Sequence, residues 1–439
     1  MVDSTNTNKQ SHSQTITMDI EVFKFGGASV NSAQAVQNMA SIVKRYHDAG
    51  RRMVIVVSAM GKTTNALEQL VPNIKQEDEQ EIIYKNLVDY HLQIVRHLFP
   101  NPTDGIYNKL RVLFDELERC RKVSSGEYNY DYDQVVSFGE LISTTIISAY
   151  LAKCGVGNQW VDVRKIIVTD GMNRCAQVDW KRTMENREKL VEMLNGGQSI
   201  VTQGFIAASG EGVTTTLGRE GSDYSAAVLS YMLDVKRMTI WKDVPGFLNA
   251  DPKYFSNTVK IEEMPYDEAI EQAYYGASVI HPKTIKPLQN KQIPLYIKSF
   301  VNPEADGSVV GPFPVIKPEV PLYIFKEDQT LMSIMPKDFS FIAEENLQRI
   351  FSILSQVGVS VNLMQNTALS FSICIDSNKI LIDKLIALLG VDFKVRYNRN
   401  MELLTVRHYT QEVIDSIVAG RQVFLEQRSR DTAQMVVEN

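Results

Sequence analysis

The alternation of apolar runs with amphipathic helical segments restricts the fold more than any other feature of the sequence. Residues 20–25 form a short apolar run and residues 53–57 a continuous one, and both end at turn-forming residues, as strands buried in a parallel sheet do. Each run is followed by apolar residues at helical spacing: Val36, Met39, Ile42 and Val43 after the first, and Leu67, Leu70 and Val71 after the second. This strand–helix–strand–helix order predicts an α/β domain with a mostly parallel sheet.

Residues 80–123 have a different pattern. Two apolar helical faces, within residues 82–98 and 110–117, are separated by Pro100 and Pro102. They predict a helical hairpin with a structural or lid role. Further apolar strands are predicted at residues 199–202, 237–241 and 295–298.

Five prolines between residues 303 and 321 mark a change of composition. Each proline removes a backbone donor and fixes φ, which predicts a linker or domain seam. Beyond it, the order strand–helix–strand–strand–helix is predicted between residues 331 and 389, and the pattern restarts at residue 403 without finishing. The predicted organisation is a polar disordered tail at 1–19, a first domain at 20–305, a linker with a strand at 306–329, a small α+β domain at 330–400 and a truncated second copy at 401–439.

Charge and cysteine usage exclude several classes of protein. The net charge is −6, and no basic stripe marks a nucleic-acid-binding surface. No run approaches the ~20 apolar residues of a membrane-spanning helix, and residues 1–19 lack the apolar core of a signal peptide. The four cysteines are far apart, without a Cys-x-x-Cys pair, which fits free thiols in a reducing compartment. We predict a cytoplasmic protein with neither a nucleic-acid nor a membrane partner.

The first segment that carries chemistry is Lys24-Phe25-Gly26-Gly27-Ala28-Ser29, at the end of the first predicted strand. Two glycines there let the backbone approach a phosphate, and the amides of the next helix would face it. Lys24 adds a mobile positive charge for the β- and γ-phosphate oxygens. Taken alone, the segment is explained equally well by a tight turn with a solvated lysine.

The second segment is the loop at residues 57–65. Gly61-Lys62-Thr63 is similar to the end of a P-loop, but the P-loop glycine five positions earlier is Val56 here, inside the predicted strand. What remains is a hydroxyl-rich loop at the carboxyl end of a parallel strand, where α/β sheets bind their ligands.

Two further segments carry acids and an arginine. Glu140 opens an apolar helix, where it either favours the helix dipole or receives the α-ammonium of an amino acid. Residues 216–227 combine glycines, Arg219 and Asp223 before a helix of small residues. Arg219 can hold a carboxylate through two parallel hydrogen bonds, and Asp223 can orient Lys24 or organise the metal–phosphate end. Turn chemistry alone is a poor explanation of this combination.

In this order and at this spacing, the four segments resemble the aspartokinase family within the amino-acid-kinase group. The resemblance covers nearly the whole chain from Asp19 on, with further matching segments at residues 202–206, 241–246, 250–253, 264–266 and 276–282. It implies a three-layer αβα catalytic domain at 20–305 with a mostly parallel sheet. It also implies that the C-terminal α+β units are ACT-like (βαββαβ) domains, which bind free amino acids.

The resemblance also implies a role for each site residue. Lys24 and Asp223 serve the transfer centre, Glu140 binds the amino group of L-aspartate and Arg219 its α-carboxylate. Mg²⁺ arrives with ATP, and no metal site of the chain's own is implied. The implied ATP phosphate residues are Lys24, Gly26, Gly27 and Ser29; the aspartate residues are Ser58, Thr64, Glu140, Arg219 and Ser222; the nucleotide-pocket residues are Lys242, Asp243, Phe247, Asp251 and Lys253.

The implied reaction converts ATP and L-aspartate into ADP and 4-phospho-L-aspartate, the first step of lysine, threonine and methionine biosynthesis. An aspartate β-carboxylate has an ordinary pKa near 4, so it is an ionised nucleophile at pH 7 and needs no base. Catalysis then reduces to positioning two anions and neutralising their repulsion. His281, which precedes a proline at a predicted helix start, is therefore interpreted as structural.

Several positions depart from the family pattern. Many relatives carry glycine at Glu220 and lysine at Ser278, where Lys283 is a candidate substitute. The last ACT-like unit lacks its closing helix, and residues 322–325 are a candidate strand to complete its sheet.

The ACT-like region also predicts regulation. A feedback effector, lysine or threonine, is expected at Ser360, Val361 and Asn362, between paired regions of a homodimer or higher homo-oligomer. Relatives often have aspartate at Asn362 and glycine at Glu345, which weakens the match.

Two other functions stay open. One is an amino-acid kinase acting on a different acyl or carbamoyl acceptor, against which the pairing of Glu140 with Arg219 argues. The other is an inactive ACT-based amino-acid sensor, against which intact Lys24 and Asp223 argue. A bifunctional enzyme with a homoserine dehydrogenase half is not expected from the length, and no Gly-x-Gly-x-x-Gly segment occurs.

Overall fold

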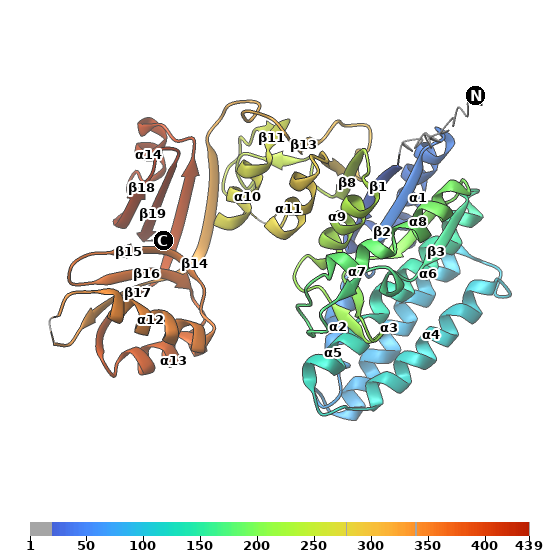
Figure 1. The fold of residues 1–439 in the computed structure, drawn as a ribbon, viewed down its shortest axis with the longest axis horizontal. Helices are drawn as coiled ribbons and strands as arrows, with labels where there is room; N and C mark the ends of the chain where they lie inside the picture. The colour runs from blue at the N-terminus through green and yellow to red at the C-terminus, as the bar shows by residue number, and fades with distance from the viewer. Residues whose placement is uncertain (1–19, 278, 339, 439) are drawn as a thin grey trace, which may run out of the picture. The chain divides into compact units, whose positions relative to one another are not determined.

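The computed structural model describes residues 20–438 except Ser278 and Phe339 (Figure 1). The predicted tail at 1–19 and the departure at Ser278 therefore lie outside the described residues. The chain divides into two compact units, Met1–Thr239 and Ile240–Asn439, with the boundary inside strand β8 (Arg237–Lys242). Each unit is described by itself.

The first unit is built on parallel strands. The strands β1 (Ile20–Phe25), β2 (Arg52–Val57), β5 (Ser199–Gln203) and β3 (Asn158–Val161) are parallel neighbours in that order, and β8 lies on the other side of β1. Every residue of β1 and β5 is buried, as a strand covered by helices on both faces requires. The predicted mostly parallel sheet is confirmed.

Helices connect these strands. Helix α1 (Ala33–Asp48) begins where the Ser32 hydroxyl accepts a hydrogen bond from the Ala35 amide (3.2 Å), and it buries the predicted apolar face. Each buried side chain of that face contributes about 1.5–3 kcal/mol. Helix α2 (Thr63–Glu68) is shorter than predicted: Leu70 and Val71 are buried but lie beyond its last residue, so the expected longer helix was wrong.

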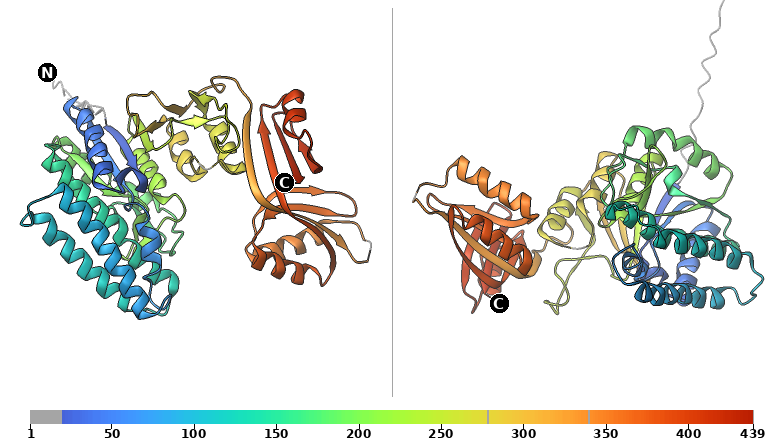
Figure 2. Two further views of the ribbon diagram at one scale, coloured as in Figure 1. Left: turned by 180° about the vertical axis from the view of Figure 1, so that it is seen from behind. Right: turned by 90° about the horizontal axis from the view of Figure 1, so that it is seen from below.

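The predicted helical hairpin is confirmed as α3 (Glu77–Leu98) and α4 (Gly105–Lys122), two long helices also visible in Figure 2. The Tyr84 hydroxyl donates to the Phe114 carbonyl (3.0 Å), and this contact joins the pair. The next helices are α5 (Tyr128–Val136) and α6 (Phe138–Lys153). The stretch they span is long and apolar enough to cross a membrane, but 72% of its most apolar window is buried inside the structure, which is typical of a core helix.

A second, three-stranded sheet in the first unit has the order β4-β6-β7. Strand β7 ends at Thr216, where the segment predicted to bind substrate begins. The remaining elements of this unit are β4 (Val168–Thr169), β6 (Ile206–Ser209), β7 (Thr214–Thr216), α7 (Trp180–Glu185), α8 (Arg187–Asn195) and α9 (Gly221–Leu233).

The second unit begins with mixed α/β structure. Strands β12, β13 and β11 follow β8 in sheet order, with β12 and β13 antiparallel. Strand β13 lies within the stretch predicted as a proline-rich linker. The elements are β9 (Phe247–Leu248), β10 (Lys260–Ile261), β11 (Glu263–Pro265), α10 (Tyr266–Tyr275), α11 (Pro282–Asn290), β12 (Leu295–Ser299) and β13 (Ser308–Gly311).

The C-terminal region forms one six-stranded antiparallel sheet, ordered β15-β16-β14-β17-β19-β18. Strands β14 (Leu322–Pro336) and β17 (Phe393–Arg407) run through both α+β copies, so the two copies share one sheet. Leu322 to Phe325 pair with Leu404 to Arg407, which confirms that this upstream strand completes the second copy. The other strands are β15 (Val361–Asn366), β16 (Phe371–Asp376), β18 (Val423–Arg428) and β19 (Thr432–Glu438).

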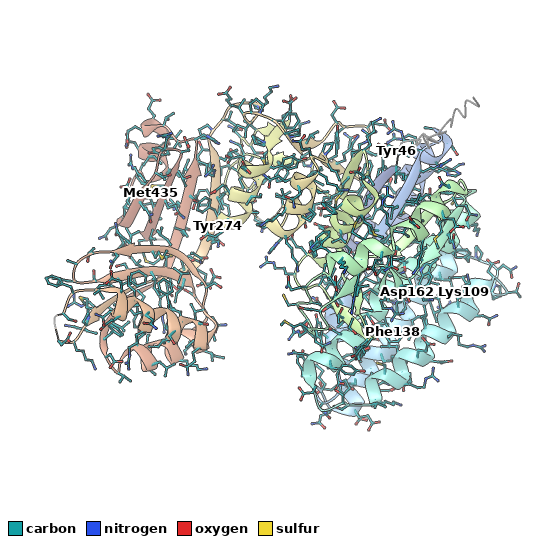
Figure 3. The ribbon with its side chains drawn as sticks, in the orientation of Figure 1. Tyr46, Lys109, Phe138, Asp162, Tyr274 and Met435 are labelled. Atoms are coloured by element: carbon teal, nitrogen blue, oxygen red, sulfur yellow. The ribbon has the colours of Figure 1, made fainter. Side chains whose placement is uncertain are left out.

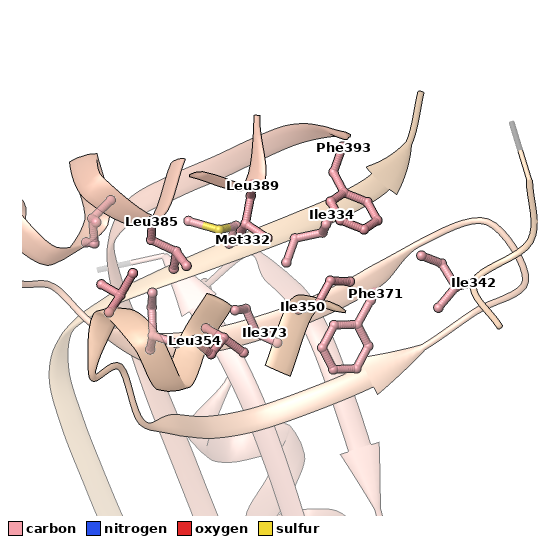
Figure 4. Packing of buried hydrophobic residues seen from close by; sticks show 13 residues of the cluster. Met332, Ile334, Ile342, Ile350, Leu354, Phe371, Ile373, Leu385, Leu389 and Phe393 are labelled. Atoms are coloured by element: carbon pink, nitrogen blue, oxygen red, sulfur yellow. The ribbon is translucent and has the colours of Figure 1, made fainter. Parts of the chain in front are cut away.

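Helices α12 (Glu344–Val357) and α13 (Lys379–Leu389) cover the first copy, and α14 (Gln411–Ile417) belongs to the second. Ile350, Leu354, Leu385 and Leu389 pack against Ile373 and neighbouring strand residues, as Figure 4 shows. The βαββα order predicted for the first copy is confirmed, and the first half of β17 completes it as βαββαβ.

Candidate active site

The centre of the candidate site is a buried ion pair. Lys24 lies near the end of β1 and Asp223 in the first turn of α9; Lys24 Nζ is 2.6 Å from Asp223 Oδ1, and their side chains are 10% and 4% exposed. Burying two charges costs desolvation energy that the pair regains only in part, so such a pair is weak evidence for stability. Its place at the carboxyl end of a parallel strand points instead to a binding site.

The phosphate segment and the loop at residues 57–65 pack backbone against backbone. The Gly61 amide donates to the Gly27 carbonyl (3.0 Å), and the Ser58 amide donates to the Phe25 carbonyl (3.1 Å). A Cβ at Gly27 would lie only 2.8 Å from the carbonyl oxygens of Ala59 and Gly61, so no larger residue fits. These bonds bring the segment that contains Lys24, Gly26, Gly27 and Ser29 next to the loop that begins with Ser58, and Thr64 follows that loop at the start of α2.

Glu140 lies in the first turn of α6, two residues after Phe138, which is labelled in Figure 3. Its Oε1 accepts the Ala59 amide (3.1 Å), while its buried Oε2 has no hydrogen-bond partner within the described residues. Burial raises the pKa of Glu140 to about 8, opposed by the Ala59 amide and by the positive charge of Lys24. Oε2 is therefore suited to bind an incoming cation. A favourable interaction with the helix dipole would not by itself account for a buried oxygen without a partner.

The segment before α9 carries the second charged group. Arg219 is exposed, and its guanidinium has no hydrogen-bond or ion-pair partner in the part of the chain that the structure describes, so it is available to a ligand. Glu220 has a left-handed backbone (φ 52°), which explains why glycine suits this position in relatives. Ser222 is 8% exposed at the start of α9.

The predicted nucleotide residues all lie in the second unit. Lys242 ends β8, and its ammonium donates to the Val279 carbonyl. The Phe247 amide donates to Ser308 Oγ (2.8 Å), and the Asp251 carboxylate accepts the Lys253 amide (2.9 Å). Asp243 follows Lys242 directly in the turn after β8.

His281 is structural, as predicted. It is the N-cap of α11, where its Nδ1 accepts the Lys283 amide (3.1 Å). This bond satisfies one free donor of the helix start.

Two buried polar residues near the site were missed by the sequence analysis. The Ser143 hydroxyl donates to the Ser58 carbonyl (2.8 Å). The Asp133 carboxylate accepts one donor from the end of β7, just before Arg219, and two from the loop before α7. The sequence offers one indication of these two residues: each is a polar residue that lies among apolar or aromatic residues of a helix.

The predicted effector residues lie at the start of β15. Ser360 is exposed and Val361 half-buried. The Asn362 side chain accepts Lys326 Nζ (2.9 Å) and donates to Gln329 Oε1 and Asp376 Oδ1 (both 2.8 Å). Asn362 is thus already bound within its own sheet.

Known proteins share this architecture. Residues 19–299 match the amino acid kinase family. Lysine-sensitive aspartokinase 3 of Escherichia coli is 33% identical over 366 residues, 82% of this chain and 79% of that protein. The crystal structure of E. coli aspartokinase III with aspartate and ADP is 28% identical with a TM-score of 0.81, covering 95% of this chain and 96% of the other. Its complex with lysine and aspartate has the same identity and TM-score, with 96% of each chain covered. On its sequence, its fold and the segments at its candidate site, this chain belongs to the aspartokinases of the amino acid kinase family.

Proposed function

We propose that this chain transfers the γ-phosphoryl group of MgATP to the β-carboxylate of L-aspartate, giving ADP and 4-phospho-L-aspartate. The observation that carries the proposal is the buried Lys24–Asp223 pair next to Glu140, whose Oε2 is buried without a partner within the described residues. Glu140 Oε1 accepts the Ala59 amide (3.1 Å), and the Ala59 carbonyl oxygen lies against Gly27 of the segment that begins with Lys24, so the pair and Glu140 lie around the same loop. A relative with the same fold binds aspartate and ADP, which supports the same substrates here.

Lys24 is proposed to contact the transferring phosphoryl group. Its ammonium, held by Asp223 at 2.6 Å, would offset negative charge that spreads over the phosphoryl oxygens during transfer. The backbone at Gly26, Gly27 and Ser29 would approach the phosphates, because no side chain intervenes at the two glycines. The residues proposed to contact the nucleotide are Lys242, Asp243, Phe247, Asp251 and Lys253.

Aspartate recognition needs one acid and one cation. Glu140 Oε2 would accept the α-ammonium, and the free guanidinium of Arg219 would hold the α-carboxylate. Ser58, Thr64 and Ser222 would contact the remaining oxygens. The β-carboxylate is then left as the nucleophile, already ionised at pH 7.

Magnesium fits this site as a companion of ATP. Mg²⁺ held with ATP takes phosphate oxygens, waters and one or two carboxylates as ligands, so it does not need a cluster of three or more His, Cys, Asp or Glu, and the described residues contain none. Asp223 is the carboxylate best placed to complete them. When bound, Mg²⁺ would neutralise charge on the β- and γ-phosphates.

A coupled assay for ADP release tests the acceptor. We expect activity with L-aspartate, and none with acetylglutamate, carbamate or a nucleoside monophosphate. ADP release with one of those acceptors and not with aspartate would establish a different amino-acid kinase. Activity with none, at full MgATP binding, would favour the inactive sensor.

We further propose feedback regulation through the C-terminal sheet. The E. coli relative is described as lysine-sensitive, and its structure has been solved with lysine, so lysine is the first effector to test. Ser360, Val361 and Asn362 are the proposed contacts. Lys326 Nζ already donates a hydrogen bond to Asn362 Oδ1, so we expect the effector to bind more weakly than it would with an aspartate at this position.

Lysine, threonine and methionine should be titrated singly and in pairs against the purified enzyme. A coupling free energy of about 1–3 kcal/mol between sites corresponds to a 5–150-fold effect on affinity. If none at millimolar concentration changes activity or melting temperature, the C-terminal region serves assembly alone. We also propose a homodimer or higher homo-oligomer through this region, to be measured by light scattering, and a cytoplasmic location where ATP is available.

A further inference from the structure

Asp133, in helix α5, is a fully buried carboxylate that no predicted role uses. Its relative exposure is 0%, and no cationic side chain pairs with it among the described residues. It accepts Thr216 Oγ1 (2.6 Å), Asn173 Nδ2 (2.9 Å) and the Arg174 amide (3.0 Å). Burial raises its pKa, and these hydrogen bonds oppose the rise. A buried carboxylate is costly unless its oxygens are satisfied, so the arrangement is specific.

One donor to Asp133, Thr216, lies on the segment that leads to Arg219, and the other two lie on a loop that is hydrogen-bonded to that segment. Thr216 is the last residue of β7, three positions before Arg219. Asn173 and Arg174 belong to the loop before α7, which is tied to the same strand by the Ala176 amide, a donor to the Thr216 carbonyl (3.0 Å). Asp133 therefore fixes the point from which the Arg219 segment departs.

Backbone hydrogen bonds also hold the residues on both sides of Arg219. The Leu217 amide donates to the Phe205 carbonyl (2.8 Å), and the Gly221 amide donates to the Gly218 carbonyl (3.0 Å) as α9 begins. Arg219 thus extends from a short stretch held at both ends. On the β7 side, the side-chain bond nearest to Arg219 is the one between Thr216 and Asp133, two residues 83 positions apart in the sequence.

The backbone on the Asp133 side leads directly to Glu140. Helix α5 ends at Val136, the Ser137 amide donates to the Asp133 carbonyl (3.4 Å), and α6 starts at Phe138 with Glu140 in its first turn. One residue therefore joins the segment that carries Glu140 to the segment that carries Arg219. These are the two groups proposed to hold the α-ammonium and the α-carboxylate.

We propose that Asp133 is a positioning residue that sets the Arg219 segment relative to Glu140 and so determines how tightly the α-amino-acid part of the substrate is bound. This inference rests on the proposed function. Its chemistry favours a group that only accepts: the N–H group of an asparagine would either face the Asn173 and Arg174 donors or force the Thr216 hydroxyl to accept where it now donates. Displacement of a binding group by about 1 Å can cost on the order of 100-fold in rate.

The same helix offers a matched control. Asp131 is 5% exposed and accepts Ser124 Oγ (2.9 Å) and the Ser125 amide (3.0 Å). These partners belong to the turn before α5, not to the Arg219 segment. On β7, the buried Thr215 controls for Thr216, because its hydroxyl bonds to Thr169 Oγ1 (2.8 Å) and not to Asp133.

The experiment compares Asp133→Asn with Asp131→Asn, and Thr216→Val with Thr215→Val, by steady-state kinetics and thermal unfolding of the full chain. We expect Asp133→Asn to raise the KM for aspartate at least about tenfold while the KM for MgATP stays within about twofold. Thr216→Val should act in the same direction more weakly. Asp131→Asn and Thr215→Val should lower the melting temperature similarly without changing either KM.

A second measurement asks whether Asp133 acts through Arg219. In an Arg219→Ala background, Asp133→Asn should raise the KM for aspartate by less than about twofold further, because the group it positions is gone. Independent, multiplicative effects would overturn the inference, as would equal shifts of both KM values or identical behaviour of the two aspartate variants. If Asp133→Asn does not fold, the pair Thr216→Val and Thr215→Val decides. Absence of aspartate kinase activity in the wild type would instead refute the proposed function.

Discussion

Substitution of Glu140 by glutamine tests the recognition of the substrate ammonium. Glu140 is 2% exposed, and burial raises its pKa from 4.5 to about 8. At pH 7 the empty site therefore holds Glu140 mostly as the neutral acid. The carboxyl must lose its proton to pair with an ammonium, so aspartate binding should release a proton and strengthen as the pH rises toward 8.

The size of the expected change in the KM for aspartate follows from the raised pKa of Glu140. Raising the pKa from 4.5 to about 8 disfavours the charged form by roughly 5 kcal/mol, which an ammonium beside Oε2 has to offset. The ionised fraction of the empty site rises from about 1% at pH 6 to about half at pH 8. We therefore expect the KM for aspartate to fall by up to about 50-fold across that interval, while the KM for MgATP stays flat.

Stability supplies a second readout of the same group. Because its pKa is higher in the folded state than in the unfolded chain, Glu140 contributes stability that is complete below about pH 4.5 and lost as the pH rises through about 8. The melting temperature gained on adding aspartate should therefore increase from pH 6 to pH 8.

The assay measures both KM values and the melting temperature at pH 6, 7 and 8. In Glu140→Gln, the KM for aspartate should become nearly independent of pH and lie at least about tenfold above wild type at pH 8. Glu81→Gln, at a residue of the α3–α4 hairpin outside the site, is the control. A wild-type KM that does not change with pH, or a Glu140→Gln enzyme with the wild-type profile, would refute the reasoning.

Four further substitutions test other residues. Lys24→Ala should lower kcat at least about 100-fold with little change in the KM for aspartate, and a variant retaining half the wild-type kcat would exclude the role. Arg219→Ala should raise the KM for aspartate at least about tenfold and leave ATP binding unchanged; loss of ATP binding instead would assign Arg219 to the nucleotide. Glu220→Gly should increase the free energy of unfolding by up to about 1 kcal/mol in urea denaturation, because it relieves a left-handed backbone; a loss of stability would contradict this. Burial raises the pKa of Glu268, but hydrogen bonds from His408 and Arg407 outweigh it and lower the pKa to about 2. The ionised Glu268 therefore stabilises the fold above about pH 4.5, and this stabilisation is lost as the pH falls toward 2. Glu268→Gln should make the urea midpoint less dependent on pH in that acid range.

Local patterns in the sequence predicted most of the fold. The apolar run at residues 20–25 becomes β1 with its predicted bounds, and the helix after it has its predicted buried face, because both depend on short-range periodicity. Glycines and charges at predicted strand and helix ends indicate the segments around Lys24, Glu140, Arg219 and Asp223 without a structure. The structure confirms the pairing of Lys24 with Asp223, and the binding roles of these residues stay predictions.

What escaped prediction depends on partners distant in the sequence. The prolines around residues 303–321 indicated a linker, yet Val309 and Val310 lie in strand β13. So short a segment becomes a strand because it pairs with β12 and β11. Asp133 was missed for the same reason: its bond to Thr216 spans 83 residues. Helix α2 ends before Leu70 although the apolar pattern continues, since tertiary packing buries that side chain without a helix.

The most direct test of the central claim identifies the phosphorylated product. Wild-type enzyme, MgATP and L-aspartate are incubated with hydroxylamine, which converts an acyl phosphate into a hydroxamate and free phosphate. We predict aspartate β-hydroxamate in a one-to-one ratio with ADP, and loss of both products in Lys24→Ala. ADP release without hydroxamate, or an equal yield in the Lys24→Ala enzyme, would contradict phosphoryl transfer to the β-carboxylate at this site.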